Sequence, residues 1–274
     1  MPQLNEYRMA GLAKRITPRV SNLVLRGSRS QRAVRLLEIY LGILQGKGAA
    51  SAWSREGEAI AVSRAISARE PVVLDIGAAI GDWSELTSAY LARPARFILV
   101  EPSPVNWPKL ERLRIDGRVD LVRGACSAEE GTGSLKGAFA GAGSASLFDR
   151  RDSFIGDARA SVFEVPLTTV SRIASDYGLH TIDFLKVDVE GAELDVFRGA
   201  APLFGDRRIK ALSFEFGSGQ VNSRAFFRDF WDLLTGHGFE LSCIAPGGRL
   251  IALTAYDEGY EYFRGVTNFL GVLR

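Results

Sequence analysis

The sequence is poor in the residues that hold structural metals and disulfides. Its 274 residues contain two cysteines, Cys126 and Cys243, and two histidines. The two cysteines lie far apart, with neither the spacing of a metal site nor that of a redox motif. These absences exclude a disulfide framework and a cysteine-rich zinc site. We therefore expect both thiols to be reduced, as in a cytoplasmic protein.

Long apolar runs are also missing. No apolar stretch approaches the roughly 20 residues that cross a bilayer, and the first 20 residues lack the apolar region of a secretory signal. The composition, with 46% hydrophobic and 24% charged residues, is that of a globular protein rather than a disordered one. Both features favour a cytoplasmic location.

The glycine pattern of dinucleotide-binding folds is absent as well. The stretch DIGAAIG, residues 75–81, follows a predicted strand and has G-x-x-x-G spacing between Gly77 and Gly81. Folds that bind NAD carry G-x-G-x-x-G at this place. The sequence therefore argues against an NAD-dependent oxidoreductase.

Charge is distributed unevenly along the chain. Residues 1–37 carry a net charge of +7, and the remaining residues carry −5. An apolar stripe with helical spacing overlaps the end of this basic region and consists of Ala33, Leu36, Leu37, Tyr40, Leu41 and Leu44. We interpret residues 1–55 as a basic, helical N-terminal extension. It is either a solvated or homodimer-forming leader, or an arm that contacts an anionic membrane surface weakly. No nucleic-acid partner is expected.

From residue 71 onward, short apolar runs alternate with helical patterns. Nearly continuous apolar strands separated by helices indicate a parallel sheet that is covered on both faces. We predict an open, doubly wound α/β sheet whose last two strands form a hairpin-like pair at one edge. The predicted strands are residues 71–77, 96–102, 119–126, 181–189, 210–217, 239–245 and 266–273, and residues 249–254 are a candidate for one more.

Polar residues follow the first three predicted strands. Ligands of open α/β sheets bind beyond the carboxyl ends of the strands. Gly77 and Gly81 allow a tight turn after the first strand. Glu101 ends the second strand, where a carboxylate can accept hydrogen bonds from both hydroxyls of a ribose and repels a phosphate on it. Ser127, after the third strand, offers a polar group near an adenine ring.

Four blocks of the sequence resemble the signature blocks of the FkbM-type methyltransferase family. They are VVLDIGAAIGDWS, FILVEPSP, VPLTTVSRIASDYGLHTIDFLKVDVEGAELDVFRGA and SFEFG. The resemblance covers roughly residues 70–235, and IDFLKVDVEGAEL is its most specific part. It implies that residues 56–274 form a class I methyltransferase domain with a Rossmann-like sheet of seven strands. It also implies S-adenosylmethionine as cofactor and methyl transfer to a hydroxyl, often of a glycan or another small-molecule acceptor.

The resemblance also assigns roles to residues by position. It implies that Asp75, Gly77 and Gly81 shape the cofactor turn and that Glu101 holds the ribose. It places Asp188 and Glu190 beside the transferred methyl group. The chain departs from the family at residue 79, an alanine where the family commonly has asparagine.

An acidic cluster ends the fourth predicted strand. Asp188 and Glu190 lie where strand gives way to helix, and Glu215 lies near the end of the next strand. Such carboxylates can take the proton of an acceptor hydroxyl, so we predict these three residues to be catalytic. Asp188 and Glu215 could also hold Mg²⁺, although no third ligand is evident. The alternative for Asp188 and Glu190 is helix capping, and we assign Glu193 to the helix surface.

Two further segments are candidates for the acceptor side of the site. Residues 136–163 form an insertion rich in glycine, alanine and serine, which suits either a mobile lid or a hairpin with a loose tip. Gln220, Asn222 and Arg224 follow the fifth strand and can form hydrogen bonds with a polyol. A non-catalytic cofactor-binding or scaffold module on the same fold is the alternative to an enzyme.

Overall fold

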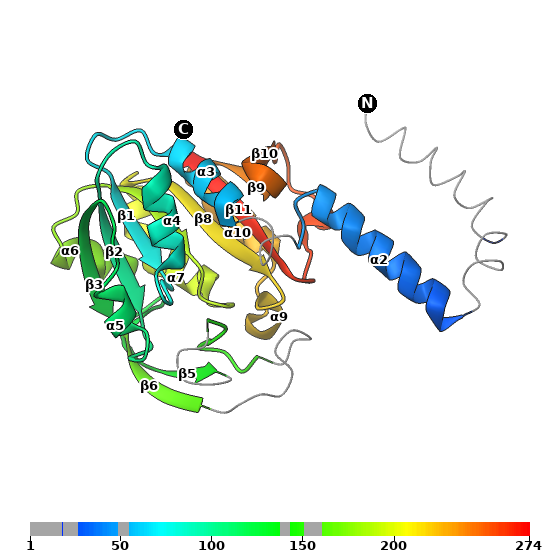
Figure 1. The fold of residues 1–274 in the computed structure, drawn as a ribbon, viewed down its shortest axis with the longest axis horizontal. Coiled ribbons are helices and arrows are strands. Elements are labelled where there is room, and N and C mark those ends of the chain that lie inside the picture. Colours follow the sequence, from blue (N-terminus) through cyan, green and yellow to red (C-terminus); the bar gives the residue numbers. More distant parts are fainter. Residues whose placement is uncertain (1–17, 19–26, 49–54, 138–142, 151–160) are drawn as a thin grey trace. The chain divides into compact units, whose positions relative to one another are not determined.

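The computed structural model describes residues 18, 27–48, 55–137, 143–150 and 161–274. The chain divides into two compact units, a smaller one from Met1 to Gly42 and a larger one from Ile43 to Arg274. Helix α2 (Ser28–Leu44) begins in the smaller unit. The larger unit contains every strand of the described residues (Figure 1). The boundary that the sequence predicts after residue 55 stays a prediction.

The larger unit is built on a sheet of eight strands in the order β10-β9-β11-β8-β7-β1-β2-β3. Five of them are parallel, namely β1 (Val72–Ile76), β2 (Ala95–Glu101), β3 (Gly117–Arg123), β7 (Ile182–Val187) and β8 (Ile209–Gly217). The other three are β9 (Phe239–Ala245), β10 (Arg249–Ala252) and β11 (Val266–Leu273). The mostly parallel, doubly wound α/β sheet predicted from the sequence is thereby confirmed.

The antiparallel end of the sheet corrects one prediction. Strand β11 runs antiparallel to both β8 and β9, and β10 runs antiparallel to β9. The last two predicted strands, β9 and β11, are therefore paired as expected. However, β11 lies inside the sheet, and the candidate eighth strand β10 forms the edge.

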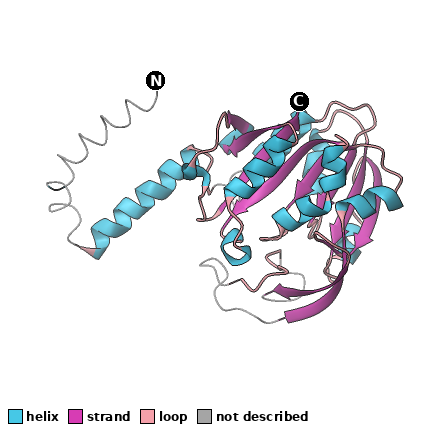
Figure 2. Ribbon diagram, turned by 180° about the vertical axis from the view of Figure 1, so that it is seen from behind, coloured by secondary structure: helices cyan, strands magenta, loops and turns pink. Residues whose placement is uncertain are grey.

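Helices cover both faces of the sheet because alternate residues of each buried strand point to opposite sides. On one face, Val73 and Phe184 pack with Ala61 and Val62 of α3 (Arg55–Ala65), and α3 contacts α4 (Asp82–Tyr90) (Figure 1). The opposite face, seen in Figure 2, packs on four other helices. These are α6 (Val170–Asp176), α7 (Glu193–Gly199), α8 (Ala201–Gly205) and α10 (Phe227–Gly236).

Aromatic side chains fill much of this second face. Phe214 of β8 stacks on Phe230 of α10, with ring centroids 5.0 Å apart, and its ring meets that of Phe197 edge to face. The remaining short helices lie in connections between these elements and are α5 (Trp107–Leu110), α9 (Gln220–Ser223), η1 (Pro246–Gly248) and η2 (Glu258–Tyr260). No helix in the described part of the chain is both long and apolar enough to cross a membrane.

A second, smaller sheet lies at the insertion between β3 and β7. Its strands are β4 (Ala125–Cys126), β5 (Gly131–Gly137) and β6 (Ser161–Thr168), in the order β4-β6-β5. The antiparallel pairing of β5 with β6 forms the base of a hairpin. Residues 138–142 and 151–160 lie outside the described residues, so the choice between a lid and a loose hairpin tip stays a prediction.

Candidate active site

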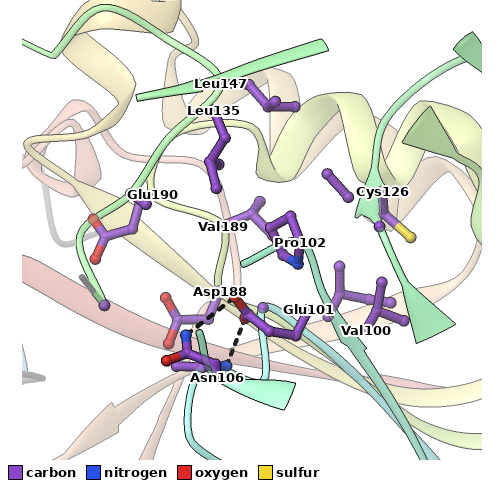
Figure 3. A pocket seen from close by; sticks show the side chains of 17 residues that line it. Val100, Glu101, Pro102, Asn106, Cys126, Leu135, Leu147, Asp188, Val189 and Glu190 are labelled. Atoms are coloured by element: carbon purple, nitrogen blue, oxygen red, sulfur yellow. Dashed lines mark hydrogen bonds between the residues drawn. The ribbon is translucent and has the colours of Figure 1, made fainter. Parts of the chain in front are cut away.

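A pocket opens at the carboxyl ends of β1, β2 and β7, next to the small sheet (Figure 3). It encloses about 530 Å³ that protein atoms do not fill, including space open to solvent. Polar side chains line one part of it, and apolar residues of the small sheet and of residues 143–147 line another. The polar lining residues are Glu101, Asn106, Asp188 and Glu190, and the apolar ones include Ala125, Leu135, Ala145 and Leu147.

The turn after β1 forms one wall of the pocket. Gly77 has φ +85°, and a Cβ atom at this position would lie 1.9 Å from the carbonyl oxygen of Asp188, so only glycine fits. Gly81 has φ +88° and precedes α4, where a Cβ atom would lie 2.3 Å from Cδ1 of Leu113. Gly77 therefore borders the pocket, whereas Gly81 fixes the packing of the turn. The tight turn predicted from the glycine spacing is present.

Glu101 is tied to this turn. Glu101 is 5% exposed, and its carboxylate accepts hydrogen bonds from the amide of Ala79 (2.9 Å) and the amide of Ser103 (2.8 Å). It also accepts one from Nδ2 of Asn106 at 3.2 Å (Figure 3). Burial raises its pKa, and these three donors oppose the shift. Two of the donors bind Oε1 and one binds Oε2. Since each carboxylate oxygen has two lone pairs, Oε2 can accept one more hydrogen bond from a ligand.

Two residues expected to bind cofactor lie elsewhere. Asp75 is fully buried beneath the turn and accepts a hydrogen bond of 2.6 Å from Ser84 Oγ of α4. Burial raises its pKa. Ser127 uses its amide to bind the carbonyl oxygen of Thr168 at 2.9 Å. Neither is among the described residues that line the pocket. Asp75 therefore supports the turn through its hydrogen bond to α4 and does not face the pocket. The pocket wall after β3 is formed by Gly124, Ala125 and Cys126 instead of Ser127.

Asp188 lines the pocket at the end of β7 and is held by Lys186. The Nζ atom of Lys186 lies 2.8 Å from Oδ2 of Asp188, and the two side chains are 5% and 28% exposed. The two residues lie on the same face of β7, as the alternation of a strand predicts. The indole ring of Trp83 covers the ammonium at 5.3 Å. The nearby acids raise the pKa of Lys186, although burial opposes this, so the lysine stays charged.

Glu58 also belongs to this polar group and was missed from the sequence. It projects from α3 with its carboxylate buried, accepting hydrogen bonds from Asn268 Nδ2 (2.9 Å) and, more weakly, from Ser213 Oγ (3.5 Å). Burial raises its pKa to about 7, and the charge of Lys186 opposes the shift. One local signal could have found it. Ala61 and Val62 follow Glu58 by three and four residues, so the three side chains lie on the same face of the helix. An acid on an otherwise apolar helix face indicates a buried carboxylate.

Glu190 lines the pocket from a loop rather than from the start of a helix. Its φ is +58°, and α7 begins three residues later with Ala192 as its N-cap. Capping therefore explains neither Asp188 nor Glu190. The carboxylate forms an ion pair with Arg150, and Ser146 Oγ donates to the carbonyl oxygen of Glu190 at 2.8 Å. Burial, followed by repulsion from Asp188, raises the pKa of Glu190 to about 7.

Glu193 was wrongly placed on the helix surface. Its side chain is fully buried and accepts hydrogen bonds from the amides of Val189 (3.0 Å) and Gly191 (3.0 Å). Burial raises its pKa to about 7. Gln220 donates to Glu193 at 2.5 Å and is itself 3% exposed. Glu193 and Gln220 thus fix the loop that carries Glu190, and Gln220 is not available to an acceptor.

Glu215 lies on β8, the neighbour of β7, as the sequence predicts. It is half-buried and is not among the described residues that line the pocket. Burial and repulsion from Asp188 and Glu190 raise its pKa. Among the residues that the structure describes, no group of three or more His, Cys, Asp or Glu side chains is arranged to hold a metal ion. The possibility that Asp188 and Glu215 hold Mg²⁺ therefore stays a hypothesis.

Comparison with known proteins gave one family and several more distant similarities. The model of the methyltransferase FkbM domain matches residues 75–241. The AMB antimetabolite synthetase AmbE of Pseudomonas aeruginosa is 35% identical over 99 residues, which span 35% of this chain and only 5% of that protein.

Two solved methyltransferase structures match over most of their length, at low identity. The O-methyltransferase from Bacillus cereus in complex with SAH has a TM-score of 0.43 and 10% identity, covering 94% of this chain and 96% of that one. The precorrin-6y C5,15-methyltransferase from Geobacter metallireducens has a TM-score of 0.40 and 12% identity, covering 80% and 87%.

Proposed function

The chain belongs to the FkbM methyltransferase family of S-adenosylmethionine-dependent enzymes, and we propose that it methylates a hydroxyl group of a sugar, a glycan or another polar metabolite. One observation carries this proposal. The turn that holds Glu101 and the acids Asp188 and Glu190 line the same pocket. This arrangement supports a nucleoside site beside a pair of carboxylates.

The residues of the pocket fit S-adenosylmethionine. The missing Cβ at Gly77 lets the turn pack directly against the backbone of Asp188, so that the turn and this acid border one pocket. Glu101 Oε2 has one lone pair available to a ribose hydroxyl. The apolar residues Ala125, Leu135 and Leu147 offer a surface for the base. When bound, the cofactor supplies an electrophilic methyl group on a positively charged sulfur atom.

Asp188 and Glu190 have different roles toward the acceptor hydroxyl in this proposal. An alcohol is a weak nucleophile until a base removes its proton, and a base is most effective when its pKa lies near the working pH. Glu190, with its pKa raised to about 7, meets this condition. Asp188 is oriented by Lys186 and is suited to hold the acceptor hydroxyl in line. Lys186 acts on the acceptor only through Asp188 and is a positioning residue.

Calorimetric titration with S-adenosylmethionine and S-adenosylhomocysteine, with NAD as control ligand, tests the cofactor. We expect binding of the two sulfur compounds, no binding of NAD, and weaker binding by Glu101→Ala. Glu111→Ala is the matched control, because Glu111 is a half-exposed surface acid paired with Arg123. Failure of both sulfur compounds to bind would contradict the proposal.

Transfer of an isotopically labelled methyl group to hydroxyl and amine acceptors tests the reaction. Asp188→Ala and Glu190→Ala should bind cofactor almost normally and lose most turnover, about 100-fold or more for the loss of a general base. Near-normal turnover by both variants would show that the catalytic assignment is wrong. Transfer to amines alone would exclude O-methylation, and cofactor binding without transfer to any acceptor would favour a non-catalytic module.

A further inference from the structure

Helix α2 carries a large apolar surface that is exposed to solvent. Five residues form it and are between 43% and 63% exposed, namely Val34, Leu36, Leu37, Tyr40 and Leu41. At 3.6 residues per turn they fall on one side of the helix. We call this surface the α2 apolar face. Contiguous exposed apolar surfaces of this kind mark contact sites.

The charges around this face have one dominant sign. Helix α2 contains Arg29, Arg32 and Arg35 and one acid, Glu38. By helical geometry, Arg32 and Arg35 lie on the side opposite the centre of the apolar face. Residues 1–44 together carry a net charge of +6, and residues 45–274 carry −4. A helix with an apolar face and a basic polar side is the form that lies in the interface of a membrane.

We propose that α2 binds the surface of an anionic phospholipid bilayer, with the α2 apolar face in the acyl boundary and Arg32 and Arg35 among the headgroups. Charge complementarity favours this occupant over a second copy of the chain, because pairing two α2 helices brings together two segments of charge +6. Contact between basic residues and anionic lipid strengthens binding by about fivefold per arginine. The proposal is independent of the reaction, since none of these residues lines the pocket.

Flotation of the full chain with vesicles tests this directly. Vesicles of phosphatidylcholine alone are compared with vesicles that also contain phosphatidylserine, at low salt and at about 0.15 M salt. We expect flotation with the anionic vesicles, weakened by salt, and little with the neutral ones. Absence of flotation with anionic vesicles at low salt would overturn the proposal.

Three double variants separate the contributions of apolar surface and charge. Leu37→Ser with Leu41→Ser should lower the affinity about tenfold or more. Arg32→Gln with Arg35→Gln should lower it about 25-fold and reduce its salt dependence. The matched control is Leu250→Ser with Ile251→Ser, which removes two exposed apolar side chains from β10 in the larger unit and should leave flotation unchanged.

Two further results would overturn the assignment. One is equal flotation by all three variants and the unsubstituted chain. The other is a dimer, detected by light scattering, that Leu37→Ser with Leu41→Ser dissociates while vesicles capture neither protein. In that case the α2 apolar face would belong to a second copy of the chain.

Discussion

The ammonium group of Lys186 lies 2.8 Å from Oδ2 of Asp188, with the lysine buried in the sheet and the aspartate at the edge of the pocket. Behind the lysine lie Asp75, its neighbour in register on β1, and the buried carboxylate of Glu58. The position of Asp188, the proposed catalytic aspartate, therefore depends on buried residues that lie behind the pocket wall.

Removing this buried cation should destabilise the fold. Lys186→Met leaves Asp188 and the buried acids without their positive partner, and breaking a buried pair typically lowers the free energy of unfolding by about 3–5 kcal/mol. The measurement is urea denaturation. Arg172→Ala is the control, because it breaks an exposed pair with Asp176 and should lower the free energy by less than about 0.5 kcal/mol. Similar losses in the two variants would contradict the role given to Lys186.

Gly77→Ala should damage both stability and cofactor binding. The added methyl group would meet the carbonyl oxygen of Asp188 at 1.9 Å, and φ +85° is strained for alanine. We expect the free energy of unfolding to fall by about 3 kcal/mol and calorimetry to show weaker binding of S-adenosylhomocysteine.

Gly205→Ala is the matched control for that change. Gly205 is the last residue of α8, and a Cβ atom there would meet nothing within 4 Å. Its substitution should leave the free energy of unfolding unchanged or raise it by up to about 1 kcal/mol. If Gly77→Ala also left the free energy of unfolding unchanged, the close approach of the turn to Asp188 would not be what restricts residue 77 to glycine.

The sequence predicts the parts of the site that depend on local pattern. Parallel strands end at one edge of the sheet, so the turn at Gly77, Glu101 and the acid Asp188 could be expected together. The alternation of side chains along a strand likewise predicts that Lys186 and Asp188 share a face. These predictions need only the strands and their direction.

The contacts between distant segments could not be predicted in this way. Glu58 meets Asn268 across 210 residues of chain, and no local pattern specifies that pairing. The position of β11 between β8 and β9 depends on the same kind of distant pairing. Glu193 was misplaced for a different reason. The positive φ angles of Glu190 and Gly191 delay the helix, and the side chain of Glu193 then folds back onto the loop.

Ala79→Gly tests the strain in the cofactor turn. Ala79 has φ +48°, a left-handed conformation that costs a non-glycine residue about 1 kcal/mol, whereas glycine adopts it freely. Glycine also loses more chain entropy on folding, so the two effects nearly cancel. Thermal and urea unfolding should find this variant about as stable as the unsubstituted protein. Ala78→Gly, at a buried neighbour without positive φ, should lose about 1 kcal/mol. Equal losses of unfolding free energy in Ala79→Gly and Ala78→Gly would exclude backbone strain at Ala79.

The pH dependence of stability should identify Glu58 as a buried, titrating group. Its pKa is raised from 4.5 in the unfolded chain to about 7 in the fold. The folded state therefore binds the proton more tightly. The resulting stabilisation is complete below about pH 4.5 and is lost as the pH rises through about 7. Glu58→Gln stays neutral and can still accept the hydrogen bond from Asn268.

The comparison of the two proteins isolates this contribution, because Glu190, Glu193 and Glu215 titrate in both. The free energy of unfolding of Glu58→Gln, relative to the unsubstituted protein, should rise by on the order of 2 kcal/mol between about pH 5 and about pH 8. Urea denaturation at the two pH values measures it, with Glu111→Gln as the exposed control that should show no such change. If the difference in unfolding free energy between Glu58→Gln and the unsubstituted protein stayed constant or fell with pH, Glu58 would be ionised over this whole pH range. The charge of Lys186 would then hold it in that state.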